Sequence, residues 1–527
     1  MTRIAMKHKS LLFLLSGILL GALVATTASM LASRQRLRVS YMNWAKLNVI
    51  LNEIEKNYVD SVDRKVLTDA ALTAALQKLD PHSVYMLPEP LKEAEESLAG
   101  GFEGIGIQFN VPNDTAVVLS VISGGPSERA GLLTGDRIIR VNDRTIAGNR
   151  TPQDTMVRLM KGPKGTHVTI TVGRGEETIP FDITRDKIPE HCVDASFMLN
   201  DTTAYLRLSK FTRTTYEECH NAISELKEKG MKKLIFDLRD NTGGYFDQAC
   251  NLANLFLPED ALIVYMQGLH RHREDTYANG RGAFQDLDLC VLIDDGSASA
   301  SEIFAGAMQD NDRGIIVGRR SFGKGLVQEP IYLTDGSGIR LTVARFYTPS
   351  GRCIQKPYSE DYAYDFYERY VHGELTSVDS IKVDSSQVYK TVGGRTVYGG
   401  GGIIPDIFVP IDTTRATPFY VACNKKAAVV RFSNRFFDTH RQGLSSISDF
   451  RSLSTYLDNC NIEGLFREYC ASLDIKPSSE AEWKEGLPYM MPEIKGLCGR
   501  YSKMGEEAYY RYLLPIDETV KAAVGAR

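Results

Sequence analysis

The sequence lacks several short motifs by which common classes of site are recognised. Its nine cysteines lie singly with no C-x-x-C pair, which argues against a zinc or thioredoxin-like site. It contains no Gly-x-Ser-x-Gly elbow, and its histidines form no recognisable catalytic motif. The formal net charge is −4, so no general excess of basic residues favours nucleic acid. These absences disfavour several functions and leave a nucleophile without a histidine base to be considered.

The composition is that of an ordinary folded protein. Hydrophobic residues make up 43% and charged residues 24% of the chain, which argues against disorder. At 527 residues the chain exceeds a single hydrophobic core, so two to four domains are expected. Scattered cysteines are expected mainly as small buried apolar residues, with a disulfide among Cys460, Cys470 and Cys498 left open.

The N-terminus carries a basic flank and then a long uncharged stretch. Residues 10–33 contain no charged side chain, and roughly 20 apolar residues cross a membrane core. Basic residues before the stretch favour a cytoplasmic N-terminus, although arginines that follow it weaken the asymmetry. We expect an anchor in the inner (cytoplasmic) membrane with a periplasmic, extracytoplasmic body, and a cleaved signal peptide is the alternative.

Residues 41–99 are expected to be helical, because apolar residues recur there at helical spacing. The run Asp80-Pro81-His82-Ser83 then ends the second helix, and a role in the turn explains His82 better than catalysis.

From Gly100 the pattern changes to short strands separated by glycine turns. Gly104-Ile105-Gly106-Ile107 allows successive backbone N–H groups to converge on an anion beside a strand edge, and that edge can accept an extended peptide. The order of motifs over 100–185 resembles a PDZ domain in the circularly permuted bacterial arrangement. The alternative is a small β-barrel whose glycines serve only turns.

Alternating strands and helices over 186–350 predict an α/β layer. One buried strand runs into Asp240-Asn241-Thr242-Gly243-Gly244, whose glycine pair is either a source of N–H donors for an oxyanion or only a tight turn. The next strand runs into Ser297-Ala298-Ser299-Ala300-Ser301-Glu302 and a helix, which exposes a serine hydroxyl at a strand-to-helix turn. Local chemistry leaves the three serines tied, and an ordinary N-capped helix is the bland alternative.

Downstream, Lys324 lies between Gly323 and Gly325. Serine with lysine is a known alternative to the Ser-His-Asp triad. A lysine must be neutral to accept a proton, so its pKa must fall from about 10.4 to roughly 7–8, which requires desolvation. Glycine neighbours permit close packing around such an amine.

The second half of the chain is less informative. Residues 356–395 are polar and tyrosine-rich and are expected to form a surface insertion. Four glycines at 399–402 indicate close approach to another backbone or a phosphate cradle, but no lysine or serine stands there in a Walker arrangement. Residues 413–527 are expected to be a mostly helical extension without assignable chemistry.

Taken together, the ordered motifs over about 41–410 resemble the carboxy-terminal processing peptidases, also called tail-specific proteases. The resemblance implies an α/β multidomain fold: a helical N-terminal segment, a PDZ-like β domain before a crotonase-like or ClpP-like peptidase core, and a helical C-terminal extension. The expected boundaries divide the chain at the following residues: 1–40 anchor, 41–99 helical segment, 100–185 PDZ domain, 186–412 peptidase core, 413–527 extension.

The resemblance also implies roles for single residues. Ser299 corresponds to the nucleophile, Lys324 to its general base, and Gln328 to a side chain that orients the lysine. The oxyanion donors correspond to the backbone N–H groups near Gly243 or Gly244 and of Ala300. The substrate's C-terminus corresponds to the ligand of Gly104, Ile105, Gly106 and Ile107. Asp310 matches an acidic position of structural role, and Thr242 replaces a usual proline.

The function implied is a serine endopeptidase, without cofactor or metal, that cleaves exported proteins at or near their unstructured C-terminal tails. A homodimer or an adaptor is an open question, and nucleic acid is not expected as a partner. Two alternatives remain: a catalytically inactive, membrane-anchored PDZ scaffold, and a hydrolase that acts on small esters.

Overall fold

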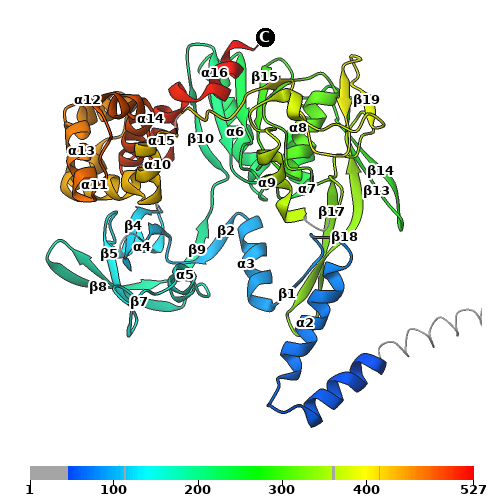
Figure 1. Ribbon diagram of the computed structural model, residues 1–527, viewed down its shortest axis with the longest axis horizontal. Coiled ribbons are helices and arrows are strands. Elements are labelled where there is room, and N and C mark those ends of the chain that lie inside the picture. Colours follow the sequence, from blue (N-terminus) through cyan, green and yellow to red (C-terminus); the bar gives the residue numbers. More distant parts are fainter. Residues whose placement is uncertain (1–44, 112–113, 123, 359–361, 415, 527) are drawn as a thin grey trace, which may run out of the picture. The chain divides into compact units, whose positions relative to one another are not determined.

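The computed structural model describes residues 45–526 except 112–113, 123, 359–361 and 415 (Figure 1). The expected anchor at 1–40 lies outside these residues. Among the helices that are described, none has both the length and the apolar character needed to cross a membrane. The chain divides into one unit that ends at Tyr85 and a second that begins at Met86.

The first unit is helical, as predicted. Residues 45–57 form one helix and α2 (Arg64–Gln77) the next, with Asp63 capping α2 by accepting the Lys65 N–H at 2.7 Å. Asp80 then accepts the backbone N–H groups of His82 and Ser83, which confirms the predicted turn. The short strand β1 (Val84–Met86) follows.

The second unit begins with α3 (Pro88–Leu98) and continues into the PDZ-like module. β2 (Gly101–Gly104) pairs with β9 (Asp186–Pro189), which brings the two ends of this module together. Its sheet has the order β3-β4-β5-β7-β8, with β6 on β5, so β3 lies at an edge. The remaining elements are β3 (Ile107–Asn110), β4 (Ala116–Val121), α4 (Pro126–Ala130), β5 (Arg137–Val141), β6 (Arg144–Thr145), α5 (Gln153–Met160), β7 (His167–Arg174) and β8 (Glu177–Thr184).

The α/β core is a sheet of the order β10-β11-β12-β15-β16-β21, parallel except for β10 against β11. One face packs against the helices α6, α7 and α8, because alternate apolar side chains such as Leu234 and Phe236 point that way. The elements are β10 (Val193–Met198), β11 (Thr203–Leu208), α6 (Thr215–Glu228), β12 (Lys233–Asp237), α7 (Phe246–Asn254), β15 (Asp288–Ile293), α8 (Ala300–Asp310), β16 (Ile315–Gly318) and β21 (Ile407–Phe408).

A second, antiparallel sheet of the core includes the strand that follows Lys324. Residues 321–325, which contain this lysine, are called the lysine segment below. In this sheet β17 pairs with β18, and β18 with β13, which pairs with β14. The strands are β13 (Leu262–Gly268), β14 (Arg271–Tyr277), β17 (Leu326–Tyr332) and β18 (Gly338–Tyr347). Residues after β18 form η2 (Tyr362–Tyr364), α9 (Asp365–Val371), η3 (Val378–Ser380), β19 (Val388–Lys390) and β20 (Thr396–Tyr398).

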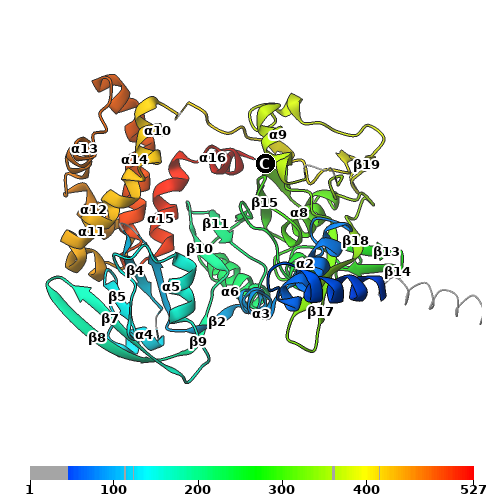
Figure 2. The ribbon, with the colours of Figure 1, turned by 60° about the horizontal axis from the view of Figure 1, so that its bottom comes forward.

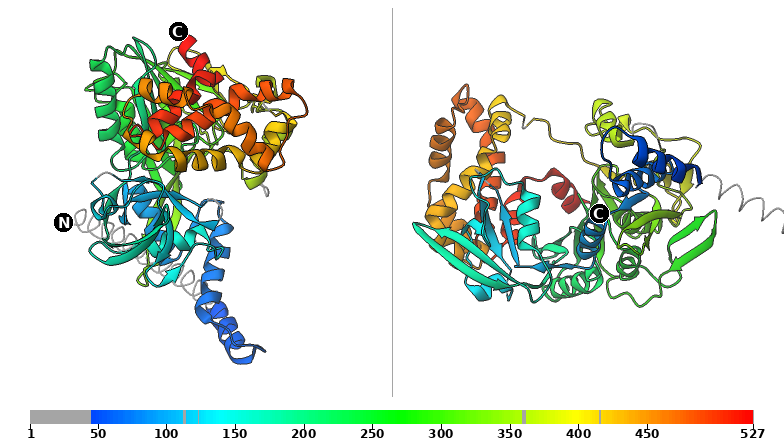
Figure 3. Two further views of the ribbon diagram at one scale, coloured as in Figure 1. Left: turned by 90° about the vertical axis from the view of Figure 1, so that its left-hand side faces the viewer. Right: turned by 90° about the horizontal axis from the view of Figure 1, so that it is seen from below.

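The C-terminal extension is helical, as predicted, and most of it shares one core around the buried Trp483 (orange to red in Figure 3). Its last helix instead covers the other face of the core sheet, where Val520 and Ala523 pack with Ile235 and Leu292 (Figure 2). The elements are α10 (Pro418–Lys425), α11 (Ala428–Ser446), α12 (Phe450–Asp458), α13 (Ile462–Ser472), α14 (Glu480–Gly499), α15 (Glu506–Leu513), η4 (Leu514–Ile516) and α16 (Glu518–Gly525).

The nine cysteines are all free, and seven of them are buried. The expectation of small buried residues is therefore confirmed for most of them. The disulfide left open among Cys460, Cys470 and Cys498 is not formed.

A buried ion pair holds the end of α8. Asp310 and Arg352 are both completely buried, with 2.7 Å between Oδ1 and Nη2. The second oxygen of Asp310 accepts the Ser350 N–H at 3.1 Å. The structural role expected of Asp310 fits these contacts.

We predict that Asp310→Ala lowers the free energy of unfolding by about 3–5 kcal/mol, because it leaves a buried guanidinium without its counter-charge. Chemical denaturation followed by circular dichroism measures this change. Glu480→Ala, which removes an exposed partner of Arg467, is the control and should leave the free energy of unfolding nearly unchanged, because exposed ion pairs contribute little. Equal small losses in both variants would contradict the prediction.

Candidate functional site

Two of the predicted loops leave neighbouring parallel strands at the same end. β12 and β15 run side by side, with Asp237 opposite Leu292. The carboxyl ends of such strands are where open α/β sheets hold their ligands. The glycine-pair loop after β12 and the serine turn after β15 therefore meet at one edge of the sheet.

Ser299 stands at the strand-to-helix turn in a conformation that few residues adopt. Its φ is 57° and its ψ is −112°, immediately before α8 begins at Ala300. A non-glycine residue in such a region costs on the order of 1–3 kcal/mol and persists only where its surroundings impose it. The sharp turn exposes the Ser299 side chain to a cavity while the helix starts behind it.

The other two candidate serines are fully buried, and both hydroxyls are engaged. Ser297 Oγ donates to the carbonyl of Leu238 at 2.8 Å, and Ser301 Oγ donates to the carbonyl of Asn241 at 2.8 Å. Both therefore pin the serine turn to the loop after β12. Ser299 is the one of the three that faces the cavity.

Glu302 joins the serine turn to the lysine segment. Its carboxylate is completely buried. One oxygen accepts the backbone N–H groups of Ser299 and Lys324, each at 2.8 Å. The other accepts the Gly323 N–H at 2.7 Å and the Ser321 hydroxyl at 2.5 Å. Burial raises the pKa of Glu302, while these four donors favour the ionised form.

Glu302 belongs to the serine motif Ser297–Glu302, but no role was predicted for it from the sequence. The sequence pattern that could have indicated a role for Glu302 is the spacing Ser299-x-x-Glu302, which is typical of a capping box. The bond from the Ser299 N–H is that of a capping box, whereas the bonds to Gly323 and Lys324 depend on tertiary structure.

The glycine pair lies directly against the serine turn. A Cβ on Gly243 would meet the Ser299 Cβ and the Ala300 nitrogen, each at 2.8 Å. The Gly243 N–H donates to the Asn241 side chain at 2.9 Å, so it is not available to a ligand. Within the described part of the chain, the N–H groups of Gly244 and Ala300 have no acceptor. The geometry favours these two over Gly243 as oxyanion donors.

The turn that presents the pair does not depend on a proline at position 242. Asn241 holds it, because its Nδ2 donates to the Leu208 carbonyl at 2.8 Å and its own carbonyl accepts the Ala298 N–H at 3.0 Å. Thr242 lies on the cavity lining.

The lysine segment is packed closely, as its glycines predicted. A Cβ on Gly323 would meet the Gly402 nitrogen at 3.1 Å, and one on Gly325 would meet the Gln355 nitrogen at 2.9 Å. The run of four glycines therefore serves the close approach of two backbones. The phosphate-cradle alternative is not needed to explain it.

The tyrosine-rich insertion is more than a surface feature, which corrects the expectation. Arg369 of α9 is buried and donates to the carbonyls of Ser321 and Phe322, at 2.9 and 3.1 Å. Because these residues directly precede Gly323 and Lys324, the insertion braces the lysine segment.

The serine turn, the glycine pair and Lys324 open onto one cavity of about 820 Å³. Ser299, Lys324 and Gln328 line it, as do Gly243, Gly244 and Ala300. The cavity thus brings together every residue predicted for the catalytic site and its oxyanion donors. A hydroxyl, an amine and two N–H groups without an acceptor are the parts that acyl transfer requires. Much of the remaining lining is apolar and comes from α3, α8 and β17: Leu91, Ala94, Leu98, Ile303, Leu326, Val327 and Pro330.

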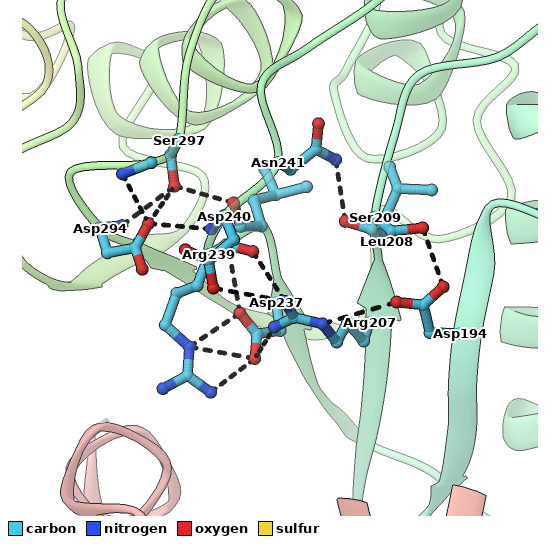
Figure 4. A network of polar contacts seen from close by, with 12 residues as sticks. Asp194, Arg207, Leu208, Ser209, Asp237, Arg239, Asp240, Asn241, Asp294 and Ser297 are labelled. Carbon is cyan, nitrogen blue, oxygen red and sulfur yellow. Dashed lines mark hydrogen bonds and ion pairs between the residues drawn. The ribbon is translucent and has the colours of Figure 1, made fainter. Parts of the chain in front are cut away.

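Charged side chains fix the end of β12 from below (Figure 4). Asp237 is completely buried and accepts from Arg239 and from the Tyr205 hydroxyl, the latter at 2.7 Å. Burial opposes its ionisation, but Arg239 and Arg207 outweigh this and hold the pKa of Asp237 at about 2. Asp294, which directly follows β15, accepts the Asp240 N–H at 2.9 Å.

The predicted carboxylate loop of the PDZ-like module lies between β2 and β3. Gly106 has a φ of 75°, which suits glycine, and Ile105 is buried. Within the described residues, the N–H groups of Ile105 and Gly106 have no acceptor. Ile107 begins the edge strand β3. The structure thus places Gly104 to Ile107 where donors and a free strand edge meet.

We predict that Glu302→Gln uncouples the serine turn from the lysine segment. Either carboxylate oxygen, when replaced by an NH₂ group, leaves at least one buried backbone N–H without an acceptor, at a cost of about 1–3 kcal/mol. We expect lower stability, measured by denaturation, and slower labelling of Ser299 by a serine-directed acylating reagent.

The control is Glu482→Gln in α14. That buried carboxylate also accepts backbone N–H groups, from Phe419 and Ser478. It should lose comparable stability while Ser299 labelling stays unchanged. Equal labelling rates in the wild type and in Glu302→Gln would contradict the role given to Glu302.

Comparison with known proteins matches both predicted domains. The model of peptidase family S41 matches residues 202–363, and that of the PDZ domain matches residues 104–184. The expected order of a PDZ domain before the peptidase domain is confirmed.

Relatives with similar organisation are found in bacteria. A carboxy-terminal-processing protease of Bartonella bacilliformis is 35% identical over 66% of this chain and 80% of its own length. A Staphylococcus epidermidis protein named "Probable CtpA-like serine protease" is 32% identical over 65% of this chain and 70% of its own length. Among solved structures, the photosystem II D1 C-terminal processing protease is 27% identical, covers 69% of this chain and 86% of its own, and has a TM-score of 0.37.

The identity of 35% extends over most of the Bartonella protein, so it is not confined to one domain. The chain therefore belongs to peptidase family S41, as a PDZ-containing member related to the carboxy-terminal-processing serine proteases.

Proposed function

We propose that this protein is a serine endopeptidase that cleaves exported proteins at or near their C-terminal tails. Ser299 is the nucleophile, Lys324 is the general base, and Gln328 orients the lysine. The single observation that supports this assignment is the cavity shared by the strained Ser299 turn, the lysine segment and the glycine pair.

The proposed reaction proceeds through an acyl-enzyme. Ser299 Oγ attacks the scissile carbonyl and gives its proton to the neutral amine of Lys324. The N–H groups of Gly244 and Ala300 stabilise the negative charge on the carbonyl oxygen. Lys324 then protonates the leaving amine, and a water molecule, deprotonated by the lysine, releases the acyl group and regenerates Ser299.

Tail capture is proposed for the PDZ domain. Among the described residues the N–H groups of Ile105 and Gly106 have no acceptor, so they suit a terminal carboxylate, and the edge strand β3 can pair with an extended peptide. The apolar lining contributed by α3 and β17 suits an unfolded segment that enters the cavity without its own tertiary structure. Anchoring of the chain by residues 1–40, with the body outside the cytoplasm, is part of this proposal and accounts for exported substrates.

We expect Ser299→Ala and Lys324→Ala each to reduce cleavage of an unfolded tail by roughly 10⁴-fold or more, since the members of such a unit act together. Cleavage is followed by mass spectrometry, and circular dichroism checks the fold. Lys227→Ala, which removes an exposed lysine paired with Asp286, is the control and should cleave normally. Wild-type turnover by Lys324→Ala would rule out the Ser-Lys mechanism.

We also expect Gly106→Ala to weaken binding of a peptide with a free C-terminal carboxylate by about tenfold, as for the loss of roughly 1.4 kcal/mol. A Cβ there would meet the Ile188 Cδ1 at 3.0 Å, in a backbone conformation with positive φ. Fluorescence anisotropy measures the affinity, and an amidated peptide should bind wild type and variant equally weakly.

Gly175→Ala is the matched control, because Gly175 also has a positive φ (64°) but open space around it. It should retain wild-type affinity. Equal affinities for the free and amidated peptides in the wild type would exclude carboxylate capture.

A further inference from the structure

The end of the C-terminal extension is built into the core. α16 covers the face of the core sheet opposite α6–α8, where Val520 and Ala523 join Ile235 of β12 and Leu292 of β15. Lys233 at the start of β12 donates to the carbonyl of Val524 at 3.2 Å and also to that of Ala526. This helix is therefore fixed along the two strands whose loops form the site.

Asp517, just before α16, makes two different kinds of contact with its two oxygens. Oδ1 caps the helix by accepting the N–H groups of Thr519 and Val520, at 2.9 and 3.1 Å. Oδ2 accepts Nη1 of Arg239 at 2.7 Å. The same side chain thus starts α16 and holds an arginine of the core.

Arg239 is the residue through which this contact reaches the chain after β12. Its Nε and Nη2 donate to Asp237, at 2.9 and 2.6 Å, and its backbone N–H donates to Asp237 Oδ1 at 3.0 Å. Asp237 lies on the α16 side of the sheet, because it is two residues beyond Ile235. The side chain and the backbone of Arg239 are therefore fixed together.

Asp517 supplies negative charge where two arginines meet one buried aspartate. Two guanidinium groups, those of Arg207 and Arg239, lie within 3.3 Å of the single buried carboxylate of Asp237. Asp517 supplies Arg239 with a second carboxylate at 2.7 Å. Asp194 lies 3.7 Å from Arg207 on the other side (Figure 4). Without Asp517, the Arg239 guanidinium would share one carboxylate with Arg207.

From Arg239 the chain leads directly to the oxyanion donors. The next residue, Asp240, has a φ of 59° and is held by Asp294, and Asn241 then fixes Gly243 through its side chain. A rotation of the backbone at Arg239 would be transmitted over five residues to Gly244. The serine turn, which Ser297 and Ser301 tie to this loop, is also held to the lysine segment by Glu302.

We propose that Asp517 is a positioning residue: the C-terminal extension sets the oxyanion loop of the site through the Asp517–Arg239 contact. This inference rests on the proposed function for its kinetic readout. It assigns the end of the extension a part in catalysis rather than in tail capture.

The test compares Asp517→Asn with Asp449→Asn in the full chain. Asparagine caps helices as well as aspartate does, so Asp517→Asn keeps the capping oxygen and places an NH₂ group against the Arg239 donor. Asp449 caps α12 through the Ser452 N–H at 2.9 Å and is exposed, so its variant changes a cap without touching the core. Thermal melting establishes that both variants are folded.

For Asp517→Asn we expect kcat on a tail peptide to fall by about tenfold or more. This loss should be smaller than the roughly 10²–10³-fold loss of kcat that follows removal of a whole oxyanion donor. KM and tail-peptide affinity should stay at the wild-type values, and Asp449→Asn should resemble the wild type throughout. An unchanged kcat, or an equal loss in Asp449→Asn, would overturn the proposal.

Amide hydrogen exchange over residues 238–245 gives a second readout that does not need activity. Asp517→Asn should increase deuterium uptake in this segment, with no change in Asp449→Asn. Equal uptake in the wild type and in Asp517→Asn would overturn the inference even if the wild type proved inactive. An inactive wild type with the expected uptake difference would instead overturn the proposed function alone.

Discussion

The carboxylate of Glu302 is the constraint on which the arrangement of this site depends. It accepts the backbone N–H of Ser299 and the backbone N–H of Lys324 on a single oxygen, so two segments 25 residues apart in the chain are fixed to one atom. Neither bond uses the side chains to which the proposed mechanism assigns the reaction. The carboxylate therefore sets the backbone positions of Ser299 and Lys324 through their N–H groups.

A buried carboxylate is costly unless its oxygens are satisfied. Here the cost is offset by four donors, and burial still raises the pKa of Glu302. The same four bonds explain how Ser299 keeps a strained backbone, since a turn at φ 57° would relax if its N–H were released. The buried carboxylate of Glu302 therefore holds Ser299 in its strained backbone conformation, through the bond that it accepts from the Ser299 N–H.

The order of motifs, with the family resemblance that it carries, was sufficient to predict the order of the domains, the α/β core and six of the residues that line the cavity. It was not sufficient to choose among Ser297, Ser299 and Ser301 on local chemistry, because the deciding bonds reach carbonyls about 60 residues away, at Leu238 and Asn241. Arg369 was likewise hidden within a polar, tyrosine-rich segment that had the composition of a surface. Long-range hydrogen bonds to backbone carbonyls leave no periodic pattern in a sequence.

The two faces of β12 explain why a C-terminal extension can matter to a site that it does not line. Phe236 points into the core under α8, whereas Asp237 points to the opposite face, where α16 lies. Successive side chains of a strand point to opposite faces of the sheet, so contacts on either face can hold the end of the strand in place. The glycine pair is presented at the edge between them, so its position depends on the serine turn above and on the charges below. A change on either face would alter the same N–H groups.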